Sequence, residues 1–187
     1  MKTFKIINDF ENYYSFTIKG VELYSKMPDY SPRFGATSRQ ADWVAPTGSF
    51  YPSQNYANPN IALPDITTWV TGNLVLNYKA FAVLKEKLKD SGEFLGVFIE
   101  GIEFSIFNTL KVIEDKYINK EKAKEVIDGG VNAGLENISF ATEGLGDAMV
   151  FKSQTDHVLH TYCTESFVEL VNEHDLSGLL FEEMVIV

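Results

Sequence analysis

The residue types that bind metal ions lie closest together at His157, His160 and Cys163. Imidazole nitrogen and thiolate sulfur are the ligands that zinc prefers. The segment 157–163 has the composition of a strand, however, and side chains alternate between the two faces of a strand. His157 and Cys163 then face one way and His160 the other. We therefore expect polar or half-buried strand residues here and no metal site.

Nucleophilic chemistry is not expected from the cysteine or the serines of this region. Acidic neighbours raise the pKa of a thiol, which makes Cys163 a poor nucleophile. Ser153, Ser166 and Ser177 lie near histidines in the sequence, but the G-x-S-x-G pattern of a nucleophile elbow is absent. Cys163 is also the one cysteine of the chain, which excludes an internal disulfide bond and indicates a reducing compartment.

Two further patterns resemble fragments of known sites. Gly144 and Gly146 suggest a phosphate-binding loop, but the acidic residues beside them would repel a phosphate, so we expect a turn or a flexible lid. Glu100 and Glu103 flank a predicted hairpin tip and have the residue type of a glycosidase pair, yet no other feature indicates that chemistry. We interpret them as solvated turn residues, and we expect a protein without a catalytic, cofactor or metal site.

Arg33 and Arg39 are the only arginines of the chain. Their planar guanidinium groups could clamp an anionic ligand through paired hydrogen bonds. Alternatively, they pair with acidic residues of the C-terminal region inside the fold, and we favour this second interpretation.

The C-terminal region, residues 129–187, contains most of the charge of the protein. It has ten acidic residues and one base, Lys152, so it carries −9 of a whole-chain formal charge of −10. Such a field repels nucleic acids and anionic membranes and favours basic proteins or cationic ligands. A solubilising surface is the alternative. Because the sequence also lacks a long apolar run and a signal-peptide pattern, we expect a cytoplasmic protein that binds neither nucleic acid nor membrane.

The C-terminal region predicts the elements that would present this charge. Strands are expected at 148–152 and 157–163 around a polar turn, and Thr164 is expected to cap a helix that runs to about His174. The segment 179–187 then returns as a closing strand. The solvent side of the helix is a stripe of carboxylates that recur every four residues, Glu165, Glu169 and Glu173.

The middle of the chain predicts a helix followed by a β-hairpin. Asn77 is expected to cap the helix and Gly92 to end it. Alternating apolar and polar residues over 94–107 predict the hairpin. The charged stretch 119–125 is expected to form a short solvated helix or loop. The apolar face of the predicted helix consists of Phe81, Leu84 and Leu88.

The N-terminal part combines two predicted strands, 4–8 and 14–20, which we expect to pair or to flank one sheet. The segment 24–65 then holds all six prolines, both arginines and several aromatic residues. Proline at this density argues against a helix or a central strand, whereas the aromatic surface argues against disorder. We expect an ordered, irregular segment wrapped on the core, with Trp43 buried and with Arg39, Tyr51 and Tyr56 as candidate anchors for a partner.

These elements predict one α+β domain over residues 1–187, made mainly of antiparallel sheet with a few helices packed on it. Residues 63–187 form its core, and residues 1–62 add strands and the long irregular segment that is rich in proline and aromatic residues.

Three stretches resemble a known family. They are ALPDITTWVTGNLVLNYKAFAVLKEKL, IEFSIFNTLKVIEDKYINKEKAKE and FKSQTDHVLHTYCTESFVELVNEHDLSGLLFEE, which together span roughly residues 63–183. Their aspartate-to-tryptophan entry into a helix, aromatic strand and closing helix and strand are similar to those of bacterial polymorphic-toxin immunity proteins, formerly a domain of unknown function. Ala123 stands where that family usually has serine, residues 117–119 lengthen a link, and residues 24–59 are not matched.

The resemblance implies a cytoplasmic antidote that binds and neutralises a cognate bacterial toxin. The acidic charge adds that this toxin is a basic domain, such as a nuclease, because nucleases hold phosphates. Alternatives are a small-molecule-binding or assembly module and an enzyme with an unrecognised site. The candidate partner-binding residues are Glu165, Glu169, Glu173, Arg39, Tyr51 and Tyr56.

Overall fold

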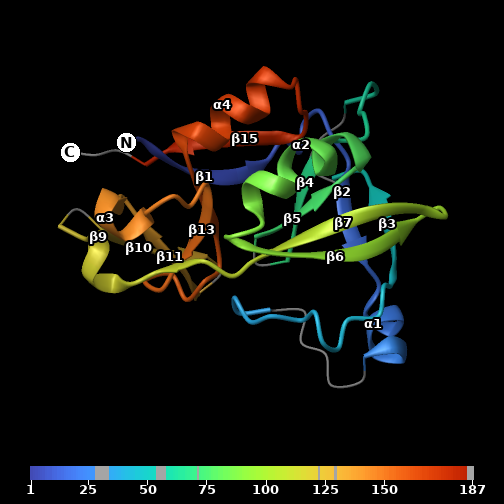
Figure 1. Ribbon diagram of the computed structural model, residues 1–187, viewed down its shortest axis with the longest axis horizontal. Helices are drawn as coiled ribbons and strands as arrows, with labels where there is room; N and C mark the ends of the chain where they lie inside the picture. Colours follow the sequence, from blue (N-terminus) through green and yellow to red (C-terminus); the bar gives the residue numbers. More distant parts are fainter. Residues whose placement is uncertain (28–33, 54–57, 71, 122, 129, 185–187) are drawn as a thin grey trace.

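The structure is a computed structural model that describes the chain except for residues 28–33, 54–57, 71, 122, 129 and 185–187. The fold is α+β and mostly sheet, which confirms the predicted class. Two larger sheets and two short strand pairs make up the strand content of the described residues (Figure 1). Among those residues, no helix has both the length and the apolar composition needed to span a membrane.

The six-stranded sheet contains the middle of the chain, in the strand order β2-β3-β6-β7-β5-β4. Its neighbours are antiparallel except for β3 and β6, which are parallel. The sheet curls until its two edge strands meet: Phe16 of one edge strand contacts Trp69 of the other, with ring centroids 6.0 Å apart. The strands are β2 (Ser15–Ile18), β3 (Thr47–Tyr51), β4 (Ile66–Trp69), β5 (Asn73–Leu76), β6 (Gly92–Ile99) and β7 (Ile102–Thr109).

The five-stranded sheet joins the two ends of the chain, in the order β15-β1-β14-β13-β8 (Figure 1). Only the pair β8 and β13 is parallel. The predicted strands 4–8 and 14–20 exist, but they lie in different sheets, so the expectation of one shared sheet is wrong. The strands are β1 (Thr3–Asn8), β8 (Val112–Ile113), β13 (Val150–Ser153), β14 (Thr161–Thr164) and β15 (Leu179–Glu183).

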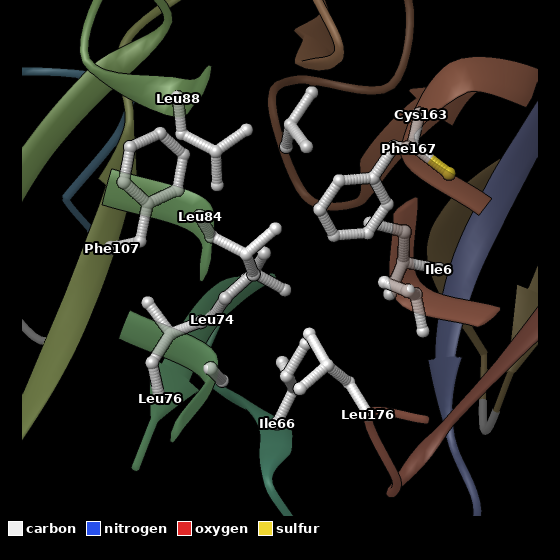
Figure 2. Close-up of a cluster of buried hydrophobic side chains, with 13 residues drawn as sticks. Ile6, Ile66, Leu74, Leu76, Leu84, Leu88, Phe107, Cys163, Phe167 and Leu176 are labelled. Carbon is white, nitrogen blue, oxygen red and sulfur yellow. The ribbon is translucent and has the colours of Figure 1, made fainter. Parts of the chain in front are cut away.

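Two of the helices, α2 (Tyr78–Leu88) and α4 (Glu165–Glu173), pack into a core that both sheets share. The helix bounds are α1 (Gly20–Lys26), α2 (Tyr78–Leu88), the 3-10 helix η1 (Asp115–Tyr117), α3 (Thr142–Leu145) and α4 (Glu165–Glu173). Figure 2 shows this core, with Leu84, Leu88 and Phe107 on one side and Ile6, Cys163 and Phe167 on the other. Buried apolar area of this kind is the main favourable term in folding.

The helix ends differ in how well the sequence predicts them. The Asn77 side chain caps α2 as predicted, since its Oδ1 accepts a hydrogen bond from the Ala80 N–H at 2.9 Å. Thr164 precedes α4 as predicted, but its side chain makes no capping bond. Gly92 does not end α2 and instead begins β6, where a Cβ would collide with the Asn108 carbonyl oxygen and the Phe107 ring. This glycine permits a close strand approach rather than a helix end.

The prediction for the segment after η1 is right for its described middle, because Lys120, Glu121 and Ala123 lie in a loop, and wrong at its two ends. Residues 119–125 were expected as a solvated helix or loop, but β10 (Lys124–Asp128) begins there and pairs with β11 (Val131–Glu136) as a two-stranded ribbon. A second short pair joins β9 (Ile118–Asn119) to β12 (Ser139–Phe140). Charged residues mask the strand pattern here, because the described positions of β10 are exposed or half-buried and need no apolar face.

The proline-rich segment 24–65 is partly irregular, and it also contributes the end of α1 and the whole of β3. The density of proline in this segment argues against a central strand, yet β3 forms there. Pro46 and Pro52 stand directly before and after β3, so they delimit the strand and do not interrupt it. Trp43 packs on the core but is only half-buried, not fully buried as predicted: its Nε1–H donates to the Gly96 carbonyl oxygen at 2.8 Å, and its ring packs edge-on against Phe34.

Candidate functional site

The best-connected polar cluster lies around Asp156, in the turn between β13 and β14. Its Oδ2 accepts a hydrogen bond from the Tyr162 hydroxyl at 2.8 Å and lies 3.0 Å from Nδ1 of His160. Lys152, on β13, is fully buried beside it, as is Asp156 itself. Sequence reasoning missed this cluster, because lysine and aspartate are rarely buried unless they are paired.

Burial dominates the electrostatics of the cluster. It lowers the pKa of Lys152 to about 8, although the Asp156 carboxylate acts in the opposite direction. Burial, and then the charge of Asp156, raises the pKa of Tyr162 far above its ordinary value. Burial also raises the pKa of the Cys163 thiol. The phenol and the thiol stay protonated, and the closed surroundings of Lys152 and Asp156 offer a substrate no access. We interpret the cluster as structural.

The three metal-type residues of the sequence point to different places. The strand predicted over 157–163 begins only at Thr161, and His157 has a left-handed φ of 56° in the preceding turn. The late start of the strand follows from Asp156, because its side chain accepts a hydrogen bond from the backbone N–H of His160 at 3.3 Å. This bond competes with the hydrogen bonds of a strand ladder. Cys163 lies in the core. Within the described residues, no group of three or more His, Cys, Asp or Glu side chains has the arrangement of a metal site.

The glycine and carboxylate patterns are divided between turns and regular elements, with Gly144 in a helix and Glu103 in a strand against the prediction. Gly144 is part of α3, where a Cβ would collide with the Tyr117 ring, and Gly146 follows that short helix with a φ of 55°. Glu100 occupies the tight turn of the β6–β7 hairpin with a φ of 51°, and Glu103 is exposed on β7. The predicted turn positions of Gly146 and Glu100 are therefore confirmed.

The acidic stripe of α4 consists of Glu165, Glu169 and Glu173, and all three residues are exposed as predicted. Phe167 and Val171 bury the opposite side of the helix. Two further exposed acids, Glu182 and Glu183, lie on β15, which runs beside α4 (Figure 1). Lys2 lies at this surface, 3.0 Å from Glu183; the hydrogen bond to Glu183 and its charge, and then the charge of Glu165, raise the pKa of Lys2. The stripe adds to a broader acidic surface.

The predicted anchors of segment 24–65 are not brought together. Arg39 lies beside the start of β6, where its backbone N–H donates a hydrogen bond to the Glu93 side chain. The Arg39 side chain is 18% exposed and forms an ion pair with Asp42 at 2.8 Å. Tyr51 is exposed at the end of β3, which extends past the far end of β6 because Gly48 already pairs with Ile99. About 30 Å of strand separates the two. Tyr56 and Arg33 lie outside the described residues.

An apolar surface that sequence reasoning missed surrounds Phe104 on β7. Ile102, Leu63 and Tyr78 are exposed there. Two hollows adjoin it, which we name by their position. The helix-side hollow, about 250 Å³, is lined by Leu76, Asn77, Tyr78, Phe81, Glu103, Phe104 and Ser105. The β3-side hollow, about 150 Å³, is lined by Ser49, Phe50, Leu63, Ile99, Glu100, Ile102 and Phe104. Ile102 belongs to the apolar side of β7, and it is exposed at the end of the hairpin that extends past β5.

Comparison of the chain with protein-family models and with curated proteins finds no match.

Proposed function

We propose that this protein is a cytoplasmic immunity protein that binds and neutralises a cognate bacterial toxin by stoichiometric association. The resemblance of residues 63–183 to such proteins motivates the proposal. The observation that carries it is the exposed acidic stripe of α4, with Glu182 and Glu183 beside it. A basic toxin domain, such as a nuclease, has the charge that complements this surface.

The size of the hollows favours a protein partner over a small ligand. Small-molecule sites usually enclose roughly 300–1,000 Å³. The helix-side and β3-side hollows are smaller, at about 250 and 150 Å³, and both border exposed apolar side chains. Exposed apolar surface flanked by acids is typical of a protein interface.

Co-expression with the product of the adjacent gene in a heterologous bacterium tests the function. We expect growth rescue, co-purification of the two proteins, and no substrate turnover by the purified antidote. Turnover by the protein alone, together with a point variant that abolishes protection but preserves binding, would contradict stoichiometric neutralisation.

Reversing the stripe, with Glu165, Glu169 and Glu173 replaced by lysine, will slow association with the toxin and remove much of its dependence on salt. Long-range attraction sets that rate, and salt screens it. Folding will change little, because exposed charges contribute little stability, although a lysine in the first turn opposes the helix dipole by about 0.3–1 kcal/mol. Stopped-flow association over a salt series measures the effect.

The matched control reverses three exposed acids elsewhere, Glu11, Glu121 and Glu143, and so changes the net charge equally. Equal slowing by both variants would mean that net charge alone matters. Unchanged rates in the α4 variant would assign the stripe to solubility.

A further inference from the structure

The outer half of β7 has a strand neighbour on one side only. Its ladder with β6 covers all of β7, from Ile102 to Thr109. In the described structure its ladder with β5 ends where Ser105 pairs with Leu76. The three residues 102–104 therefore extend past the end of β5 as part of the projecting β6–β7 hairpin (Figure 1). An open strand edge of this kind is a template for another strand.

The turn geometry identifies which backbone groups are open. Glu100 and Gly101 form a two-residue turn with φ of 51° and 81°, so Ile99 and Ile102 are the hydrogen-bonded pair that closes the hairpin. Hydrogen-bonding direction alternates along a strand. The N–H and C=O of Glu103 therefore point away from β6, in phase with Ser105, which pairs with β5. Glu103 carries the open donor and acceptor.

The two hollows adjoin this edge and meet at Phe104, which lines both of them. Glu103 lines the helix-side hollow, and Ile102 lines the β3-side hollow. Successive residues of a strand face opposite sides. A strand added along β7 would consequently direct one side chain into the helix-side hollow and its neighbours into the β3-side hollow. Main-chain bonds with alternate side chains in pockets are the pattern of peptide recognition by strand addition.

The lining chemistry selects the side chains. A residue placed opposite Glu103 meets a carboxylate and the exposed ring of Tyr78, which favours lysine or arginine. Residues on the other face meet Phe104, Ile102 and Leu63, which favour an apolar side chain. We propose that the outer edge of β7 binds an extended segment of the partner protein, added as a strand, in which apolar and basic residues alternate.

A second copy of this chain fits the edge poorly. Two β7 edges paired about a two-fold axis would bring Glu103 and Glu100 of one copy close to the same acids of the other. Like charges opposed across strands destabilise their pairing. The inference rests on the proposed function only for the identity of the partner as a toxin.

A synthetic peptide tests the edge without a toxin. ¹⁵N-labelled protein is titrated with a short peptide in which valine and lysine alternate, and with a matched peptide in which valine and glutamate alternate. We expect the lysine peptide alone to shift the amide signals of Ile102, Glu103 and Phe104 and to slow hydrogen exchange at Glu103. Shifts confined to other residues, equal shifts with both peptides, or no shifts would overturn the proposal.

Variants then test the edge with the toxin. Glu103→Gln removes the charge and should weaken binding by about threefold, since exposed charge pairs contribute little. Glu103→Pro also removes the outward N–H and should weaken binding about tenfold further, the effect of one lost hydrogen bond. Proline is tolerated at edge positions whose N–H faces solvent. Equal affinity of the two variants would contradict strand addition.

An exposed isoleucine offers a control that does not depend on proline. Ile102→Asp places a charge at the β3-side hollow and should weaken toxin binding at least about tenfold. Ile127→Asp alters an isoleucine of the β10–β11 ribbon that is similarly exposed, since Ile127 is 59% exposed and Ile102 is 64% exposed. It should have no effect on toxin binding. Growth rescue that survives both Glu103→Pro and Ile102→Asp would keep the toxin-binding function and refute the edge. Peptide binding at Glu103 without toxin binding would support the edge as a binding site and refute the toxin-binding function. Dimerisation through β7 in sedimentation would also refute it.

Discussion

Replacing Asp156 with asparagine will lower the free energy of unfolding by about 3–5 kcal/mol near neutral pH. Asparagine keeps the shape and an acceptor oxygen for the Tyr162 hydroxyl, but it removes the negative charge that lies beside Lys152. A buried ammonium group without that compensation destabilises the folded state. Urea unfolding measures the loss, and Asp147→Asn, an exposed acid nearby, should change stability little.

The loss will depend on pH in a defined direction. The pKa of Lys152 is about 8 in the folded protein, against an ordinary 10.5, so the unfolded chain binds more protons between those values. Stability therefore rises as pH increases through this window. In Asp156→Asn the attraction is gone and the folded pKa falls further, so the rise begins at lower pH. The difference between variant and wild type will therefore shrink as the pH rises toward about 8, the folded pKa of Lys152 in the wild type, and will stay constant above it.

A second substitution separates charge from packing. Lys152→Met in the Asp156→Asn background removes the buried amine and should recover most of the lost stability, because an apolar replacement of a buried ion pair is often neutral. A loss below about 1 kcal/mol, a loss independent of pH, or no recovery in the double variant would contradict the electrostatic interpretation of the cluster.

Trp43→Ala and Tyr51→Ala will separate stability from binding. Trp43 loses its bond to the Gly96 carbonyl oxygen and its packing on Phe34, so we expect the free energy of unfolding to fall by about 3 kcal/mol. Tyr51 is 45% exposed beside Phe50, which lines the β3-side hollow. Its removal should leave the melting temperature nearly unchanged and weaken toxin binding by about 2 kcal/mol, roughly thirtyfold.

The control for Tyr51 is Tyr24→Ala, because Tyr24 is a tyrosine of α1 with 60% of its surface exposed. Tyr24→Ala should alter neither the melting temperature nor the affinity for the toxin. Thermal unfolding and titration calorimetry measure both effects on the same samples. If Tyr51→Ala destabilised the fold and left affinity unchanged, Tyr51 would be a covering residue. Arg39 and Tyr56 stay predicted anchors, although the low exposure of Arg39 limits the area that it can offer.

Local patterns account for the elements that the sequence predicts well. Short-range patterns predict the apolar face of α2, the alternation of the β6–β7 hairpin, and the apolar and acidic sides of α4. The residues of each pattern lie within one or two helical turns or strand repeats of each other. The pairing of β1 with β14 and β15 is not local, and no pattern in residues 3–8 specifies those neighbours. The prediction of strands succeeded where the prediction of their partners did not.

The candidate site shows the same division. Exposure of Glu165, Glu169 and Glu173 follows from their spacing on a helix, so the sequence predicts it. The open edge of β7 depends on where β5 stops, which only the assembled sheet reveals. The Asp156 cluster contradicts the ordinary preference of charged side chains for water, so composition points away from it.

The order of strands in the five-stranded sheet also constrains how the protein can be made. A ribosome produces β1 long before its neighbours β14 and β15, although Thr3 pairs with Thr164 and Phe4 with Glu183. At about 5–20 residues per second, β1 waits on the order of ten seconds with its edges unpaired. The six-stranded sheet can assemble before residues 110–183 are made, whereas α4 follows β14 in the chain and is positioned later. A nascent chain that lacks α4 therefore offers no acidic stripe, and the completed five-stranded sheet appears later than the six-stranded one.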